Sequence, residues 1–99
     1  MSAQAPIPYA VRSKILADPY YKVCARKSDG GCQGRITWEH AIMYAGKRVQ
    51  EVWCILPLCV EHHLGSSLNK ALNIKLAMSR ATEEDRKKYP RLKWDILNT

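Results

Sequence analysis

The chain has 99 residues, and its sixteen Lys and Arg outnumber nine Asp and Glu to give a formal charge of +7. This length allows a single domain over residues 1–99, and its core alone would be marginal, because so short a chain buries only about two thirds of the surface it exposes when unfolded. The opening residues carry no apolar secretory signal, and no stretch is long enough to span a bilayer. We therefore expect an intracellular, reducing location, the cytoplasm, and no membrane partner, while the positive charge favours a polyanion such as DNA.

The N-terminal part is predicted to contain an arm, a helix and a turn. Residues 1–8 contain two prolines and favour a loosely held, flexible arm. Residues 9–16 are predicted to form an amphipathic helix whose apolar side is made by Val11, Ile15 and Leu16. Asp18 is then expected to cap a short turn that starts at Pro19 and leads to Cys24.

A tight loop and two strands are predicted next. Residues 25–35 contain three glycines around Cys32, which suits a backbone that curls until two thiolates face one ion, as in a zinc knuckle. Residues 35–46 indicate a strand that leads into a loop, and residues 48–59 indicate a second apolar strand that is broken by Pro57. Two tryptophans of these segments are expected to lie in the core, Trp38 and Trp53.

The pattern becomes helical after Cys59, although Gly65 argues against one unbroken helix. A further helix is predicted over residues 72–80. Another begins after Thr82, which is a good cap followed by acidic residues, and runs to residue 89. Three apolar residues near the C-terminus are expected to fold back onto the body, namely Trp94, Ile96 and Leu97.

Soft metal ligands are spaced as a four-coordinate zinc site requires. The spacing is Cys-x7-Cys from Cys24 to Cys32, followed by Cys-x2-His from Cys59 to His62. Two disulfides are the alternative, but in a reducing compartment cysteines more often bind metal. His62 and His63 could exchange roles, and we favour His62 because its spacing from Cys59 suits one knuckle turn. Zinc would contribute on the order of 10 kcal/mol to folding.

Glu39, His40 and His63 are then left over, and these residue types bind a harder ion and move protons. A carboxylate with one imidazole leaves open positions for a cation that can polarise a phosphoryl oxygen. An imidazole titrates near neutral pH, so His40 suits a general base. Adjacent strand residues face opposite ways, so Glu39 and His40 can serve one centre only if the strand ends there. An ordinary surface carboxylate is the alternative for Glu39.

The order strand, loop, strand, helix, with Glu39-His40 ending the first strand and Cys-x2-His-His opening the helix, resembles the HNH nuclease family. The resemblance covers about residues 24–69, and residues 70–99 are expected to add C-terminal helices. It implies an α+β fold with a ββα-metal, treble-clef-like core, a structural zinc knuckle and flanking helices. It further implies a structural zinc held by Cys24, Cys32, Cys59 and His62.

The same resemblance implies a catalytic site. Glu39 and His63 would hold a divalent cation, Mg²⁺, Mn²⁺ or another, while His40 takes a proton from water. The chain departs from the family pattern because Glu39 stands where Asp is commoner, and because His62 replaces a cysteine. In the family, a middle Asn braces the loop that carries the base, and its position corresponds to Cys54 here. A thiol is a weak substitute for an amide, so either Gln50 takes over the bracing or Cys54 is simply a buried hydrophobe.

The first functional hypothesis is a metal-dependent endonuclease that hydrolyses DNA phosphodiester bonds with His40 as general base. The alternative, motivated by the missing Asn, is a non-catalytic zinc-stabilised nucleic-acid-binding module, and a third is a structural zinc protein with a protein partner. The form of the nucleic acid, DNA or RNA, and the oligomeric state stay open. Small size is reminiscent of phage or mobile-element nucleases. Four basic residues near the site are candidates for phosphate contacts, with generic surface charge as the alternative: Arg35, Lys47, Arg48 and Lys70.

Overall fold

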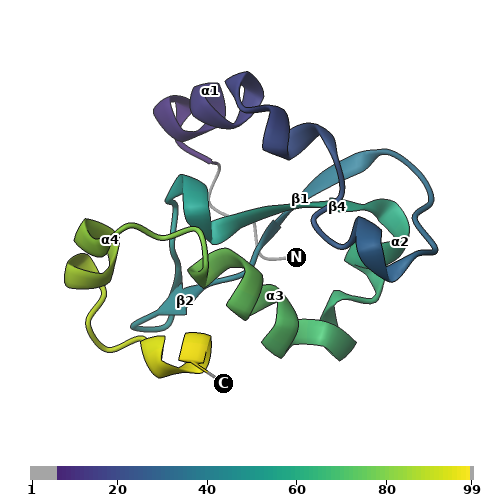
Figure 1. The fold of residues 1–99 in the computed structure, drawn as a ribbon. Coiled ribbons are helices and arrows are strands. Elements are labelled where there is room, and N and C mark those ends of the chain that lie inside the picture. The colour runs from purple at the N-terminus through teal and green to yellow at the C-terminus, as the bar shows by residue number, and fades with distance from the viewer. Residues whose placement is uncertain (1–6, 99) are drawn as a thin grey trace.

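The computed structural model combines short helices with two small antiparallel sheets (Figure 1). It describes residues 7–98, so residues 1–6 of the expected arm lie outside the described part. The mixture of helices and strands confirms the α+β class. The α-helices are α1 (Tyr9–Ala17), α2 (Val60–Leu64), α3 (Lys70–Met78) and α4 (Glu83–Lys88). Short 3₁₀ helices connect or follow them: η1 (Pro19–Lys22), η2 (Lys27–Asp29), η3 (Val52–Cys54), η4 (Ser66–Asn69) and η5 (Trp94–Asn98).

The larger sheet pairs β1 (Ile36–His40) with β4 (Ile55–Cys59), from Ile36 opposite Cys59 to His40 opposite Ile55. The smaller sheet pairs β2 (Met43–Tyr44) with β3 (Lys47–Arg48). A two-residue turn joins β2 to β3, and both of its residues have the positive φ that such a turn requires, 53° at Ala45 and 78° at Gly46. Because β4 runs directly into α2, the end of the strand and the first turn of the helix form one continuous segment (Figure 1).

The strand predicted over residues 48–59 is wrong in two respects, its first residue and the break at Pro57. The backbone forms a 3₁₀ turn over 52–54, so the strand begins only at Ile55. Pro57 does not break it and lies opposite Trp38. The carbonyl of Pro57 accepts a hydrogen bond from Ala25 N–H at 2.7 Å, on the edge away from β1. The nitrogen and carbonyl of one strand residue point to the same edge, so the missing N–H of Pro57 removes no bond of the β1–β4 ladder.

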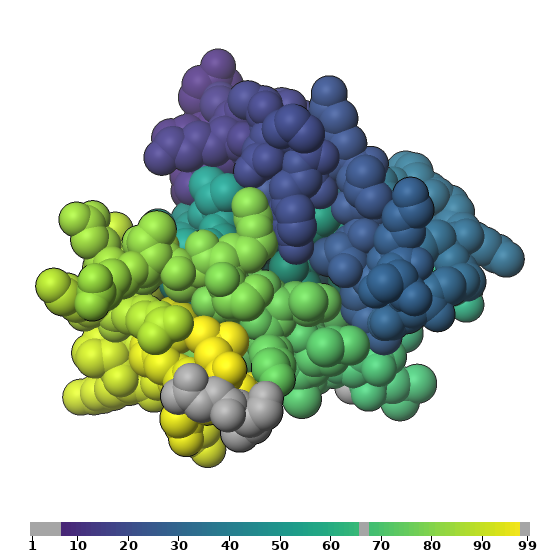
Figure 2. Space-filling view, viewed as in Figure 1, coloured from purple at the N-terminus to yellow at the C-terminus, as the bar shows by residue number. Residues whose placement is uncertain are grey.

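The core lies on both sides of β4, which explains why all five of its residues are buried. Ile55 packs with Ile15 and Tyr21 in a small cluster that Trp38 partly covers. Leu56 and Leu58 alternate to the other side and join a larger cluster, together with η3 and the C-terminal half of α3. From one side, the N-terminal segment and the green and yellow C-terminal segments hide most of the teal central strands (Figure 2).

Most predicted helices are present with shifted ends. Asp18 caps η1 by accepting from Tyr20 N–H at 3.0 Å, as expected. The predicted apolar side of α1 is wrong at Leu16, which is 64% exposed, whereas Ile15 is buried. The helix predicted over residues 72–80 spans 70–78 instead. Thr82 forms a full capping box with Asp85, and Trp94 packs on Trp53, which confirms that the C-terminal residues fold back.

Candidate functional site

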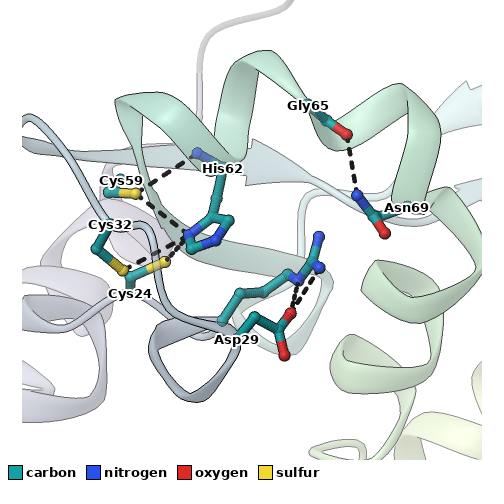
Figure 3. Close-up of polar contacts among 8 residues, drawn as sticks. Cys24, Asp29, Cys32, Cys59, His62, Gly65 and Asn69 are labelled. Atoms are coloured by element: carbon teal, nitrogen blue, oxygen red, sulfur yellow. Dashed lines mark hydrogen bonds and ion pairs between the residues drawn. The ribbon is translucent and has the colours of Figure 1, made fainter.

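Three cysteines and one histidine meet where the knuckle loop, β4 and α2 converge (Figure 3). Cys24 follows η1, Cys32 lies in the loop after η2, Cys59 ends β4, and His62 belongs to α2. The four ligand atoms all lie within 4.8 Å of one another. The Nδ1 atom of His62 lies 3.3 Å from Cys24 Sγ, 3.6 Å from Cys32 Sγ and 3.3 Å from Cys59 Sγ.

These distances fit one tetrahedral metal ion. Metal–sulfur bonds of about 2.3 Å and a metal–nitrogen bond of about 2.0 Å place sulfur and nitrogen about 3.5 Å apart at the tetrahedral angle. One ring nitrogen carries a single proton or a single lone pair, so it cannot form three separate hydrogen bonds. All four cysteines are free thiols, so the disulfide alternative is wrong. The cluster contains His62 and not His63, as predicted, and it could hold a metal ion.

The knuckle loop is fastened to α2 by backbone contacts that bring Cys32 close to the helix. Val60 N–H donates to Arg35 O at 3.1 Å, and Glu61 N–H donates to Gln33 O at 3.2 Å. Gly34, with φ of 85°, lies between these two acceptors, and a Cβ at this position would lie 2.9 Å from Val60 Cβ. Only glycine satisfies both the positive φ and this close approach. The glycine content of the loop thus has a specific structural use at Gly34.

Two thiols of the cluster have pKa values shifted in opposite directions. Burial acts to raise the pKa of Cys59, but the N–H groups of His62 and Gln33 and the other two thiols outweigh it and hold the pKa at about 6. Burial and hydrogen bonding to Cys24 and Cys59 raise the pKa of Cys32 to about 11. One thiolate is therefore favoured at neutral pH while its neighbour resists ionisation. A cation at the centre would favour the thiolate form of both Cys32 and Cys59.

A second polar group joins β1 to α2. Glu39 Oε2 lies 3.3 Å from His63 Nε2, and both side chains are partly exposed. Thr37 and Glu39 are two apart on β1 and therefore share the face that meets His63. Thr37 Oγ1 lies 2.5 Å from His63 Nδ1 and 2.8 Å from Leu58 O. Sequence reasoning missed Thr37, although its spacing of two from Glu39 is a signal that could have found it.

Thr37 fixes which nitrogen of His63 carries a proton. A hydroxyl has one hydrogen, and here it is donated to the carbonyl of Leu58, which can only accept. The same oxygen therefore accepts from His63 Nδ1–H. Nε2 is left to face the carboxylate of Glu39. A proton or a cation between Nε2 and Glu39 would satisfy both, and two ligand atoms about 2.1 Å from one ion lie about 3.0 to 3.4 Å apart.

His40 ends β1, and one further backbone hydrogen bond continues the pairing with the β4 side of the chain. Ala41 N–H donates to the backbone carbonyl of Cys54 at 2.9 Å. His40 Nε2 lies 3.0 Å from Gln50 Oε1, an oxygen that can only accept, so Nε2 carries the proton and Nδ1 keeps a lone pair. Cys54 is fully buried, and burial raises its pKa far above the ordinary thiol value. Of the two alternatives for the family's Asn position, Gln50 contacts the imidazole and Cys54 is a buried hydrophobe.

Glu39 and His40 line one cavity of about 270 Å³, so adjacent residues do reach a common space. The rest of its lining comes from β2, β3, α3 and the loop after β1: Ala41, Met43, Arg48, Lys70 and Asn73. Arg48 and Lys70 of the four predicted basic contacts lie here. Arg35 precedes β1 and Lys47 begins β3, and both are exposed and outside this lining.

Comparison of the chain with models of known protein families, with curated proteins and with solved structures finds no match. Within residues 7–98, no helix combines the length and the apolar character needed to cross a membrane. The two polar clusters and the cavity are therefore the observations from which a function is inferred.

Proposed function

We propose that this chain is a metal-dependent endonuclease of the HNH type that hydrolyses DNA phosphodiester bonds. The observation that carries the proposal is the contact of Glu39 Oε2 with His63 Nε2 at 3.3 Å, together with the cavity that Glu39 and His40 line beside two basic residues. The antiparallel β1–β4 pair leading into α2 is the arrangement expected for a ββα-metal, treble-clef-like core.

One of the two polar clusters would stabilise the fold, and the other would take part in the reaction. Cys24, Cys32, Cys59 and His62 have the donor set and spacing for a structural Zn²⁺. Glu39 Oε2 and His63 Nε2 would hold a divalent cation such as Mg²⁺ or Mn²⁺. When bound, such an ion polarises a phosphoryl oxygen and stabilises the charge on the leaving oxygen.

The protein's own residues would activate the water. His40 Nδ1 has the free lone pair that a general base needs, because Nε2–H is directed to Gln50. Gln50 therefore orients the ring and stabilises the protonated form that follows proton transfer. His40 lies on the cavity wall next to Glu39, which brings the attacking water and the scissile phosphate into one space.

A plasmid-cleavage assay with the zinc-loaded chain in Mg²⁺, Mn²⁺ or Ni²⁺ tests this proposal. We expect His40→Ala and Glu39→Gln to lower the cleavage rate by about 10² to 10⁴-fold, the usual contribution of a general base or an ion ligand. Glu61→Gln is the matched control, because Glu61 is an exposed carboxylate of the neighbouring helix. Its rate should equal that of the unchanged protein.

Two outcomes would contradict the endonuclease. Cleavage that His40→Ala leaves unchanged would remove His40 from the reaction and point to a contaminating nuclease. DNA binding that weakens steeply with salt, but without cleavage in any divalent cation, would favour the non-catalytic nucleic-acid-binding module.

A further inference from the structure

The cavity that Glu39 and His40 line also has two basic side chains whose role the reaction just described leaves open. Arg48 reaches it from β3 and Lys70 from the first residue of α3, and both are exposed. Asn73, one turn further along α3, is only 3% exposed and completes the wall. An acidic group and two basic groups thus line one space of about 270 Å³.

Asn73 is the unusual member of this wall. Its Oδ1 atom is buried and has no hydrogen-bond partner among the residues that the structure describes. Leaving a buried amide unpaired costs stability, so folded proteins rarely retain one without a use. The last torsion of an Asn side chain is broad, and its rotation can present the NH₂ group in place of the oxygen. Asn73 can therefore offer a donor to a molecule that enters the cavity.

We propose that Arg48, Lys70 and Asn73 form a subsite for a phosphate group of the nucleic-acid strand, next to the phosphate that is cleaved. This inference rests on the proposed function, because it assigns the substrate to the same cavity. A guanidinium can bind two phosphate oxygens, an ammonium adds a point charge, and an amide N–H adds a directed hydrogen bond. The carboxylate of Glu39 repels an anion, so the phosphate would lie next to Arg48 and Lys70.

The test measures binding without cleavage. A fluorescein-labelled 16-base-pair DNA duplex is titrated with the zinc-loaded full chain in the absence of other divalent cations, and its anisotropy gives Kd. We expect Asn73→Leu to raise Kd about tenfold, the effect of one hydrogen bond to a charged group. The same substitution should raise Tm, because it replaces an amide whose buried oxygen is unpaired by an apolar side chain of similar size. If Asn73 has only a structural role, Asn73→Leu should leave Kd unchanged and lower Tm.

Arg48→Ala and Lys47→Ala provide a charge-matched comparison. Each removes one positive charge from β3, so the salt-dependent, long-range part of DNA binding changes equally. Only Arg48 lines the cavity, so we expect a Kd at least about fivefold higher for Arg48→Ala than for Lys47→Ala. Equal Kd values for the two variants would overturn the proposal.

Two further measurements keep the test decisive. If Asn73→Leu does not fold, Asn73→Asp, which has the same size, should still raise Kd because a negative charge repels phosphate. Inorganic phosphate and the DNA duplex should each shift the side-chain NH₂ resonances of Asn73 in the unchanged protein. Resonances that stay in place at saturating DNA would overturn the subsite. The nuclease proposal is tested separately. If it fails, the plasmid is not cleaved, but the differences in Kd between the variants remain.

Discussion

At the scale of single residues, Thr37 has the clearest effect on chemistry. Its hydroxyl contacts both Leu58 O and His63 Nδ1, so the peptide backbone of β4 sets the protonation of a histidine in α2. Residues that hold the second nitrogen of a ligating histidine commonly contribute to metal affinity as much as to position. In the proposed function Thr37 is a positioning residue, because it would act on the ion only through His63.

Thr37→Val should therefore weaken the binding of Mn²⁺ to the Glu39–His63 pair by about 10 to 100-fold. Valine keeps the β-branched shape of threonine in the strand but cannot accept from Nδ1–H. Calorimetric titration of Mn²⁺ into the zinc-loaded protein measures this affinity. Thr37→Ser retains the hydroxyl and is the control, which should bind Mn²⁺ like the unchanged protein. Equal affinities for the valine and serine variants would remove Thr37 from this role.

At the scale of elements, the important junction is between the knuckle loop and α2. Gly34 is in the left-handed region and lies directly against Val60, the first residue of the helix. Gly30 and Gly31 have similar positive φ values, but a Cβ at either would meet no atom within 4 Å. Gly30 also has ψ of 174°, a conformation that almost only glycine adopts, so Gly31 is the better comparison for Gly34.

Gly34→Ala is expected to destabilise the zinc-loaded protein more than Gly31→Ala. Both substitutions place a side chain at positive φ, which costs about 1 to 2 kcal/mol. Only Gly34→Ala adds a clash with Val60, which should cost a further 1 to 3 kcal/mol or so. Urea unfolding monitored by tryptophan fluorescence measures both free energies. If the two variants unfold at the same urea concentration, the close approach of the loop to α2 is not maintained in solution.

At the scale of the whole molecule, the fold depends on connecting two apolar clusters through β4. Cys24 and Cys59 belong to the larger cluster and are also members of the metal-ligand set. Tyr21 holds the smaller cluster to β4, with its hydroxyl 2.6 Å from Val52 O and 2.9 Å from Ile55 O. Loss of the ion would leave three thiols crowded together at the edge of the main core.

Metal removal should therefore unfold most of this chain. We expect a strong chelator to abolish the cooperative thermal transition in near-ultraviolet circular dichroism, because ion binding supplies much of the folding free energy in so small a domain. Cys32→Ser should abolish stoichiometric zinc in elemental analysis. Cys54→Ser is the control, because Cys54 is buried outside the ligand set and its variant should keep zinc. A chelated protein with an unchanged melting curve would show that the ion is dispensable.

The sequence alone determined the α+β class, the Cys3His ligand set, the caps at Asp18 and Thr82 and the break at Gly65. These features depend on residue type and on spacing within a few positions, so they are legible without tertiary contacts. The tertiary structure decided the start of β4, the continuation of the strand through Pro57 and the exposure of Leu16.

Tertiary structure also decided which polar groups meet. The contact of Thr37 with His63, the choice of Gln50 over Cys54 beside His40, and the position of Asn73 all join residues from separate elements. Each depends on the register of β1 against β4 or on how α3 packs on the sheet. No local pattern predicts these contacts. The residue type at a position fixes what its side chain can do, whereas the packing of the whole chain decides which residue it meets.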